Sequence, residues 1–561
     1  MLLFPFRYVW WLLTSVRRSL ARPPDFVEFL IEESLPALPD PPRPLWQRLT
    51  SRPRLSIKEL GERFEAIGRD SRIEGVVLHL RPVGMPMASL QDLRELVANL
   101  RKSDKRVVAW APYYTTGTYY LACACDEILL MPVGAVQPLG IATTGIFLAD
   151  GLARLGVKAD FVAISPYKTA ADTLTRSTMS EAYRDQVTWL LDSQYGELVA
   201  AIGESRHVDE KAARAIIDGS PYGDEAAAAR HVVDGILPEE ELTAHLGRGA
   251  KPVDIGTWER ARRAMRAPAP TLGRGKYVAL IRIEGTIVDG RSSRMPIQPP
   301  VELPLLGDER AGDLTVVQVA RRVAADKRAA AAVLYVNSRG GSATASEAMR
   351  QALAQVAARK PLVVVMGPVA GSGGYWVAMP GSWIVSRPGT LTGSIGVLTG
   401  KLVTGAMWAK LLLNRETVAF GEHVTLENDE RPYSDEQRAT VTREVERIYG
   451  LFVDVVSRAR KLTADEVQPI AAGRVWTGKQ ALERKLVDEM GGLDAGARKA
   501  RALAGLPDAT PLREARPPKR TIPPLAAAAA GGWMGYVLEA ISMLSRAPAL
   551  AVMYYLPGGP E

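Results

Sequence analysis

Cysteine, histidine and long uncharged hydrophobic runs are scarce in this 561-residue chain. Two cysteines exclude a disulfide-rich scaffold and a zinc site built on cysteine. The five histidines are scattered, with no HExxH pattern and no close pair, which argues against a histidine-based metal enzyme. The 49 glycines and 39 prolines stay below the roughly 25–30% share that indicates disorder. We therefore expect a globular protein that needs no metal or other cofactor.

The net charge of +8 is unevenly distributed along the chain. The basic excess gathers in residues 1–22, 251–276 and 513–520, and the remainder is slightly acidic. This pattern suits an anionic membrane surface better than a nucleic-acid groove, although solvated linker charge would produce it too. We expect no nucleic-acid partner.

Apolar segments stand near both ends of the chain. Residues 1–16 are apolar and aromatic, but Arg7 interrupts them, and the run is shorter than the ~20 residues that a spanning helix needs. Because Arg17 and Arg18 follow the run instead of preceding it, the segment does not fit a signal peptide. We favour a helix lying in a membrane interface; a short tilted span and a helix packed on the protein itself are the alternatives. Residues 522–556 predict a second surface anchor or a subunit contact.

The sequence repeats itself. Residues 77–80 (VLHL) match residues 333–336 (VLYV) at an offset of 256, and residues 233–234 match residues 487–488 at an offset of 254. Many matches on two offsets indicate a duplicated domain of about 200 residues. The predicted parts are an N-terminal anchor and linker (1–45), a first repeat (46–250), a basic linker (251–275), a second repeat (276–500) and an apolar tail (501–561).

Strands alternate with helices in each copy. In the second copy, residues 277–283, 331–336 and 361–366 are short apolar runs, each followed by a turn or a helical stretch, which is typical of βαβ units. Ser434 and Gln437 form a capping-box pattern that predicts the start of a long helix. The expected fold class is α/β.

A serine and a glycine pair follow two of these strands. Ser372 lies between glycines in GPVAGSGGYW, where a strand gives way to a helix, and Gly373 comes next. Such a turn places a hydroxyl at a helix N-terminus, where backbone N–H groups and the helix dipole favour developing negative charge. Gly340 and Gly341, in NSRGGS, could aim backbone N–H groups at an oxyanion. Glycine-rich turns without chemistry are the alternative for both.

Lys168, in SPYKTA, is either a solvated loop charge or a base. A lysine base must lose its proton, so it must be desolvated until its pKa approaches about 7–8. The repeat favours the base, because the counterpart of Lys168 is Val424 or Glu422 and the counterpart of Ser372 is Thr116. One copy keeps the lysine and the other keeps the serine, as expected of a single site shared between duplicated halves.

Five motifs together resemble signal peptide peptidase A (protease IV) in its long, duplicated form, over residues 70–500. They are GSGGYW around Ser372, NSRGGSATASE before it, LTGSIGV at 391–397, PYKTAAD around Lys168 and RVWTGKQALERKLVDEMGG at 474–492. The resemblance implies two tandem crotonase/Clp-like α/β domains and a serine peptidase with a Ser–Lys dyad. Ser372 would be the nucleophile, Lys168 the general base, and Gly340 and Gly341 the oxyanion hole. The family usually has proline where Arg339 stands.

The resemblance also implies a bacterial protein at the cytoplasmic membrane, on a side that stays open. Its members are homo-oligomers, here expected to be tetrameric, that hydrolyse residual signal peptides through an acyl-enzyme. Two alternatives remain: a crotonase-like acyl-CoA enzyme and a catalytically inactive membrane scaffold. Neither requires both Ser372 and Lys168, so the retention of both favours the peptidase.

Overall fold

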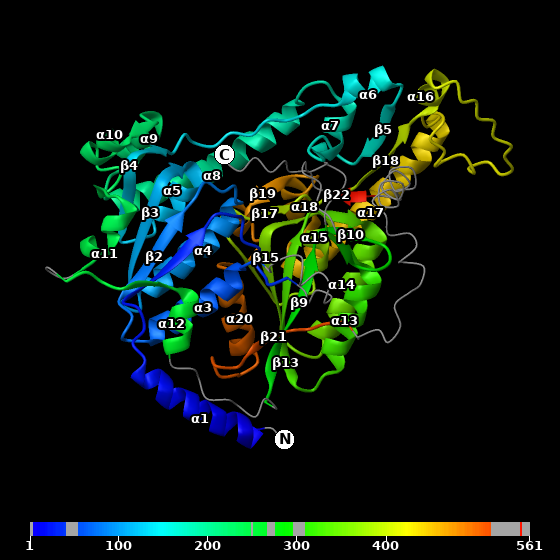
Figure 1. Cartoon of the computed structure of the whole chain (residues 1–561). Coiled ribbons are helices and arrows are strands. Elements are labelled where there is room, and N and C mark those ends of the chain that lie inside the picture. The colour runs from blue at the N-terminus through cyan, green and yellow to red at the C-terminus, as the bar shows by residue number, and fades with distance from the viewer. Residues whose placement is uncertain are drawn as a thin grey trace. The chain divides into compact units, whose positions relative to one another are not determined.

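A computed structural model of the chain describes residues 4–40, 54–247, 251–265, 275–294, 309–517 and 550–552. It divides into two compact units, which are described separately below. Unit 1 takes residues 1–142 and 194–275, and unit 2 takes residues 143–193 and 276–556. Figure 1 labels the elements and colours the chain along its length.

Unit 1 is built on a sheet of seven described strands in the order β6-β4-β3-β2-β1-β8, with β7 beside β4. All of these strands pair in parallel except β6, which runs antiparallel to β4. Every residue of β2 is buried, which explains why this strand does not alternate between apolar and polar residues and has His79 as its one polar member. The strands are β1 (Phe26–Ile31), β2 (Gly75–Leu80), β3 (Arg106–Thr115), β4 (Glu127–Gln137), β6 (Tyr222–Gly223), β7 (Gly235–Ile236) and β8 (Ile255–Thr257).

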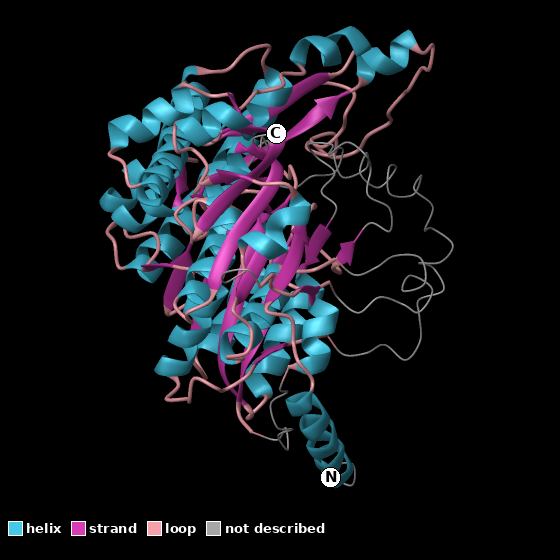
Figure 2. Cartoon of the chain, turned by 60° about the vertical axis from the view of Figure 1, so that its left-hand side comes forward, coloured by secondary structure: helices cyan, strands magenta, loops and turns pink. Residues whose placement is uncertain are grey.

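The helices of unit 1 bury one face each. In α3, Ser56 and Glu59 form a capping box, and Leu60, Phe64 and Ile67 recur at helical spacing on the buried side. Figure 2 shows strands in magenta and the helices around them in cyan. The helices are α1 (Phe4–Leu20), α3 (Ile57–Arg69), α4 (Met87–Arg101), α5 (Thr116–Ala122), α9 (Glu210–Asp218), α10 (Asp224–Ala229), α11 (Leu242–His245) and α12 (Trp258–Ala264), together with the C-terminal part of α8 (Glu181–Arg206).

Unit 2 contains two sheets. The larger has the order β19-β17-β15-β13-β9-β21, with β16 beside β15 and β20 beside β16, and the smaller has the order β11-β12-β10-β14-β22-β18-β5. The larger sheet consists of β9 (Tyr277–Glu284), β13 (Ala329–Ser338), β15 (Leu362–Gly371), β16 (Trp383–Ser386), β17 (Leu391–Gly393), β19 (Val475–Thr477), β20 (Glu489–Met490) and β21 (Leu512–Glu514). The smaller consists of β5 (Lys158–Ala163), β10 (Thr286–Val288), β11 (Ser293–Arg294), β12 (Glu309–Gly312), β14 (Gly340–Ser342), β18 (Leu398–Val403) and β22 (Leu550–Val552).

The helices of unit 2 follow the same logic. The capping box expected at Ser434 and Gln437 is present, and α17 begins at Asp435, directly after Ser434. The helices are α6 (Ala149–Leu155), α7 (Asp172–Thr175), α13 (Asp313–Ala325), α14 (Ala343–Ala357), α15 (Gly373–Ala378), α16 (Gly405–Lys410), α17 (Asp435–Arg460), α18 (Ala464–Val467), α19 (Gly478–Glu483) and α20 (Leu493–Leu503).

The duplication is visible element by element. β3 corresponds to β15 at the offset of 256, and α8 corresponds to α17 at the offset of 254. An ion pair repeats as well: Arg206 with Asp234 in unit 1, and Arg460 with Asp488 in unit 2. The α/β class expected from the sequence is therefore confirmed, and so are the three strands expected in the second copy, which are β9, β13 and β15.

The compact units do not follow the boundaries drawn from the repeat. Residues 143–193, in the expected first repeat, belong to unit 2, because β5 pairs with β18 along its whole length. The expected linker at 251–275 contains β8 and α12, and β8 pairs with β1, which itself precedes the expected start at residue 46. In α12 the buried residues are alanines, so its arginines face outward and give the segment a linker-like composition. β21, beyond residue 500, pairs with β9.

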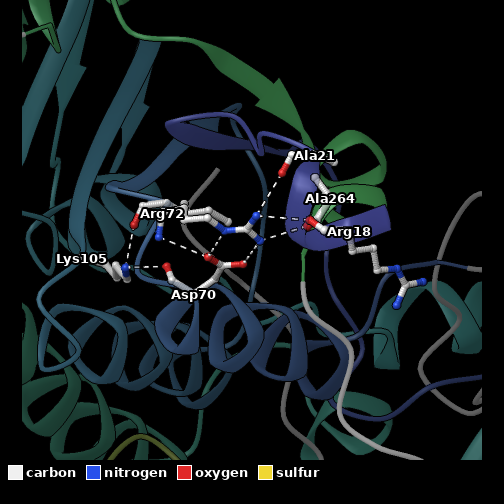
Figure 3. A network of polar contacts seen from close by, with 7 residues as sticks. Arg18, Ala21, Asp70, Arg72, Lys105 and Ala264 are labelled. Carbon is white, nitrogen blue, oxygen red and sulfur yellow. Dashed lines mark hydrogen bonds and ion pairs between the residues drawn. The ribbon is translucent and has the colours of Figure 1, made fainter. Parts of the chain in front are cut away.

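The N-terminal segment forms helix α1. Arg72 fixes its C-terminal end, since the guanidinium donates hydrogen bonds to the carbonyls of Arg18, Ala21 and Ala264 (Figure 3). A cation at this end of a helix complements the unpaired carbonyls and the dipole. None of the described helices combines the length and apolar character needed to cross a membrane. The apolar tail expected at 522–556 lies outside the described residues, apart from β22.

Candidate active site

Ser372 stands at the junction of β15 and α15. Its backbone has φ 55° and ψ −119°, a conformation that non-glycine residues rarely adopt. Its N–H donates to the Gly393 carbonyl at 2.8 Å, and its own carbonyl accepts from Trp376 N–H in the first turn of α15. Held backbone strain of this kind is concentrated at functional sites. The flanking Gly371 and Gly373 leave this sharp turn uncrowded by side chains.

Lys168 reaches Ser372 within unit 2. Its Nζ donates to Ser372 Oγ at 2.8 Å, and both side chains are buried, Lys168 being 3% exposed. Lys168 follows β5 and precedes a short 3₁₀ turn at Thr169–Ala171, so a loop carries it. This separation is an ordinary hydrogen-bond distance.

Ser394 completes the surroundings of the amine. Lys168 Nζ donates to Ser394 Oγ and to the Ser394 carbonyl, each at 3.0 Å. Ser394 also has a positive φ, of 50°, and is 2% exposed. With three oxygen acceptors and no carboxylate among these contacts, burial lowers the pKa of Lys168 from 10.5 to about 7. Near neutral pH the amine is therefore able to exist uncharged and to accept a proton.

The glycine pair lies next to the serine turn. A Cβ added at Gly373 would come within 3.2 Å of Gly340 Cα and 3.3 Å of Gly341 N, so the two turns touch. Gly341 has φ 152°, and a Cβ there would lie 2.0 Å from the Ile287 carbonyl oxygen, which excludes any side chain. The N–H of Gly340 donates to Ser338 Oγ at 3.1 Å, which fixes the turn.

An extended segment runs along the glycine pair. β22 pairs antiparallel with β14, with Gly340 opposite Val552, Gly341 opposite Ala551, and Ser342 opposite Leu550. Leu550 is also opposite Leu398 of β18. The gap between β14 and β18 therefore accepts one extended strand, beside the turn that carries Ser372.

Among the described residues there is no cluster of three or more His, Cys, Asp or Glu side chains that could hold a metal ion. Cys123 and Cys125 are both free and buried, and such cysteines pack as small apolar side chains.

Known proteins match this chain over most of its length. The model of Peptidase family S49 matches residues 99–251 and 354–507. Protease 4 of Salmonella typhi is 32% identical over 451 residues, covering 78% of this chain and 70% of that protein. The chloroplastic serine protease SPPA of Arabidopsis thaliana is 28% identical over 459 residues, covering 81% of this chain and 66% of that protein.

The chain belongs to peptidase family S49. The family match in two segments confirms the duplication, and it confirms the expected peptidase class over the acyl-CoA enzyme. Protease 4 of Haemophilus influenzae is a further relative, 28% identical over 77% of this chain and 71% of its own length. A solved ClpP1 mutant from Listeria monocytogenes covers 39% of this chain at 12% identity and a TM-score of 0.24, too weak a likeness to bear on the fold.

The site of this S49 chain combines expected and unexpected residues. The structure brings together Ser372, Lys168 and all three glycines expected from the sequence. Sequence reasoning missed Ser394, although it lies in the LTGSIGV motif and directly follows Gly393, just as Ser372 directly follows Gly371.

The counterparts of Ser372 and Lys168 in the other copy are hydrogen-bonded elsewhere or exposed. Thr116 Oγ1 donates to the Gly140 carbonyl in unit 1, and Val424 is 60% exposed in the loop after α16. Glu422, the other counterpart of Lys168, is exposed in the same loop.

Proposed function

We propose that this chain is a serine endopeptidase in which Ser372 is the nucleophile and Lys168 is the general base. The observation that carries the proposal is the 2.8 Å hydrogen bond between a buried amine, with a pKa lowered to about 7, and a hydroxyl on a strained strand-to-helix turn. A nucleophile beside a base, with the base oriented by a third group, is the arrangement that hydroxyl nucleophiles need. Ser394 is that third group.

The acylation step begins with neutral Lys168. Its Nζ takes the proton of Ser372 Oγ as the oxygen attacks the peptide carbonyl, and the resulting ammonium is held by the two oxygens of Ser394. When the tetrahedral intermediate collapses, Lys168 returns this proton to the leaving amine, and the peptide C–N bond breaks. Water then attacks the acyl-enzyme, with Lys168 again accepting and returning the proton.

The developing oxyanion needs backbone donors close to Ser372. Gly341 N would lie 3.3 Å from a Cβ added at Gly373, so both residues border this corner, and Gly373 lies at the start of α15, where N–H groups lack partners within the helix. Since the N–H of Gly340 is already bonded to Ser338 Oγ, we assign the oxyanion contact to Gly341 and Gly373, with Gly340 shaping the turn.

The substrate is an extended peptide that adds a strand between β14 and β18. Strand addition supplies main-chain hydrogen bonds that do not depend on sequence, and β22 supports this binding mode because it already pairs with both strands. The resemblance to signal peptide peptidase A supports apolar substrates such as residual signal peptides.

The membrane surface is the proposed location of the chain. Tyr8, Val9, Trp10, Leu12 and Leu13 of α1 are exposed, with Trp10 at 71% and Leu13 at 65%, and Arg72 anchors the far end of the helix. An apolar face with tryptophan beside basic residues is suited to the lipid interface. Deleting residues 1–22 should release the protein from anionic vesicles without abolishing turnover, and full-length protein that stays soluble without detergent would contradict this location.

Self-association is proposed through the loop that follows α16. Leu412 is 87% exposed, Val418 87% and Phe420 91%, an apolar surface that a lone subunit would leave in water. Substituting Phe420→Ser should lower the mass measured by light scattering. A mass that does not change, or a monomeric parent protein, would rule this loop out as the contact.

A fluorophosphonate probe tests the catalytic assignment. Labelling at Ser372 that is lost in Ser372→Ala and strongly reduced in Lys168→Ala supports the peptidase. An acyl-CoA enzyme or an inactive scaffold would leave Ser372 unlabelled, and that result would refute the proposal.

A further inference from the structure

The loop that carries Lys168 is held from outside by residues 471–477. Ser165 Oγ donates to the Ala472 carbonyl, and Gly473 packs directly on the Lys168 backbone: an added Cβ would lie 2.5 Å from Lys168 N and 2.7 Å from its Cα. Lys168 is thus positioned by a segment of unit 2 that is distant in sequence and contributes no group to the proposed chemistry.

Arg474 contacts Tyr167, which precedes Lys168 in the chain, and also Ser394, which bonds the Lys168 amine. Its guanidinium carbon lies 4.1 Å from the centroid of the Tyr167 ring, directly before Lys168 in the chain. Its carbonyl accepts the Ser394 N–H at 2.7 Å, and Ser394 supplies two of the three acceptors of Lys168 Nζ. One residue therefore joins the loop that holds the amine to the turn that holds its acceptors.

The Tyr167 ring is also supported by Trp189. The two ring centroids are 5.7 Å apart, and Trp189 Nε1–H donates to the Val475 carbonyl at 2.9 Å. Trp189 in turn stacks on Trp476 at 5.1 Å. The aromatic ring next to the base is thus fixed between a cation and an indole, both tied to the same segment.

We propose that Arg474 and Tyr167 are a positioning pair that sets the direction of the Lys168 amine toward Ser372 and Ser394. The inference rests on the proposed function and adds two residues that do not touch the substrate. A lysine side chain has four rotatable bonds, so a small shift of its backbone moves Nζ by an ångström or more. Misplacement of that size costs on the order of 100-fold in rate.

Arg474 and Tyr167 also keep water away from the Lys168 amine. Burial is the cause of the lowered pKa of Lys168, so a loosened loop that admits water should raise that pKa toward its usual value. The charged groups on the elements packed against the loop are Arg474 itself, Asp172 in α7, and four residues in the part of α8 that belongs to unit 2. These four are Glu181, Arg184, Asp185 and Asp192, and all of them are exposed.

The experiment compares variants that remove the pair with variants that spare it. Arg474→Gln removes the cation, Tyr167→Leu removes the ring, and Tyr167→Phe keeps the ring and so the cation–π contact. Arg484→Gln is the matched control, because Arg484 also stacks on an aromatic ring of unit 2, Trp476 at 3.9 Å, and that ring is separated from Tyr167 by Trp189. Each variant is measured for kcat, KM and the pH dependence of fluorophosphonate labelling, with thermal unfolding as the check on folding.

Arg474→Gln and Tyr167→Leu should each lower kcat about 10- to 100-fold with KM nearly unchanged, and should move the labelling midpoint to higher pH. Tyr167→Phe and Arg484→Gln should leave the midpoint where it is. If Arg474→Gln does not fold, Tyr167→Leu carries the test, because it leaves the Arg474 backbone contact in place.

If the midpoint pH of labelling does not move in Tyr167→Leu, the positioning role is overturned. An equal shift of that midpoint in Arg484→Gln would overturn it too. The two proposals fail in different ways. Wild-type protein that never labels at Ser372 refutes the peptidase mechanism, whereas normal labelling in all four variants refutes the positioning pair alone.

Discussion

The pH dependence of acylation tests the proposed base most directly. If the pKa of Lys168 is about 7, roughly a tenth of the amine is neutral at pH 6 and about nine tenths at pH 8. The labelling rate of Ser372 should therefore rise about tenfold between pH 6 and pH 8 and then level off. With the usual pKa of 10.5, the rate would still climb about tenfold per pH unit at pH 9.

The free energy behind this shift is considerable. Lowering the pKa from 10.5 to about 7 corresponds to roughly 5 kcal/mol in favour of the neutral amine. Because the pKa is lower in the folded chain, the unfolded chain binds the proton first as the pH falls. Wild-type protein should therefore lose stability relative to Lys168→Met, by up to a few kcal/mol, as the pH falls from about 10 to 7, and little more below that.

Rapid-mixing labelling with a fluorophosphonate across pH 5.5–10 gives the profile, with Ser372→Ala as the blank. A rate that keeps rising through pH 9 would refute the desolvated base. If the rise of the labelling rate with pH disappears when His423 or His79 is replaced, the base is a histidine, and the pairing of Ser372 with Lys168 is refuted.

The remaining predictions concern the dyad, one glycine and the tail. Ser372→Ala and Lys168→Ala should each remove nearly all peptidase turnover, and the double variant should be little worse, since such pairs act as a unit; clearly additive losses in kcat would argue against a dyad. Gly473→Ala should lower both Tm and activity, because its Cβ would meet the Lys168 backbone at 2.5 Å. Gly421→Ala is the control and should retain activity, because Gly421 also has a positive φ but has open space around it. Equal losses of activity in the two variants would contradict the contact between Gly473 and Lys168. Deleting residues 517–561 should lower KM several-fold with kcat unchanged, because β22 pairs with the strand offered to substrate, and an unchanged KM would show that the tail does not compete.

Local patterns predicted much of this site. The strand, the GSGG turn and the helix around Ser372 are adjacent in sequence, and each part has its own signature: an apolar run, glycines and a helical period. Lys168 has no such local signature, since a lysine in a loop is usually solvated. It was found only because the repeat showed that its counterpart is not a lysine, and because the family motif surrounds it.

Long-range pairing was not predictable in the same way. The pairing of β5 with β18 joins segments about 240 residues apart, and nothing in either strand specifies its partner. The contacts of Arg474 with Tyr167 and Ser394 are equally remote in sequence. The domain boundaries drawn from the repeat could not anticipate that residues 143–193 would pack in unit 2. A repeat shows which segments are similar in sequence, whereas a compact unit is defined by which segments contact one another.

The placement of residues 143–193 in unit 2 accounts for the single site of the proposed mechanism in a chain with two copies. Residues 143–193 carry Lys168 into unit 2, where Ser372 already stands, so the lysine is supplied from outside the second copy. The second copy has no lysine between Lys410 and Lys461, and Val424, one of the two counterparts of Lys168, lies in an exposed loop. Thr116, conversely, needs no base once its hydroxyl is bonded to the Gly140 carbonyl. On the proposed mechanism, the first copy supplies the base and the second copy supplies the nucleophile, so a single site needs both copies of the duplication.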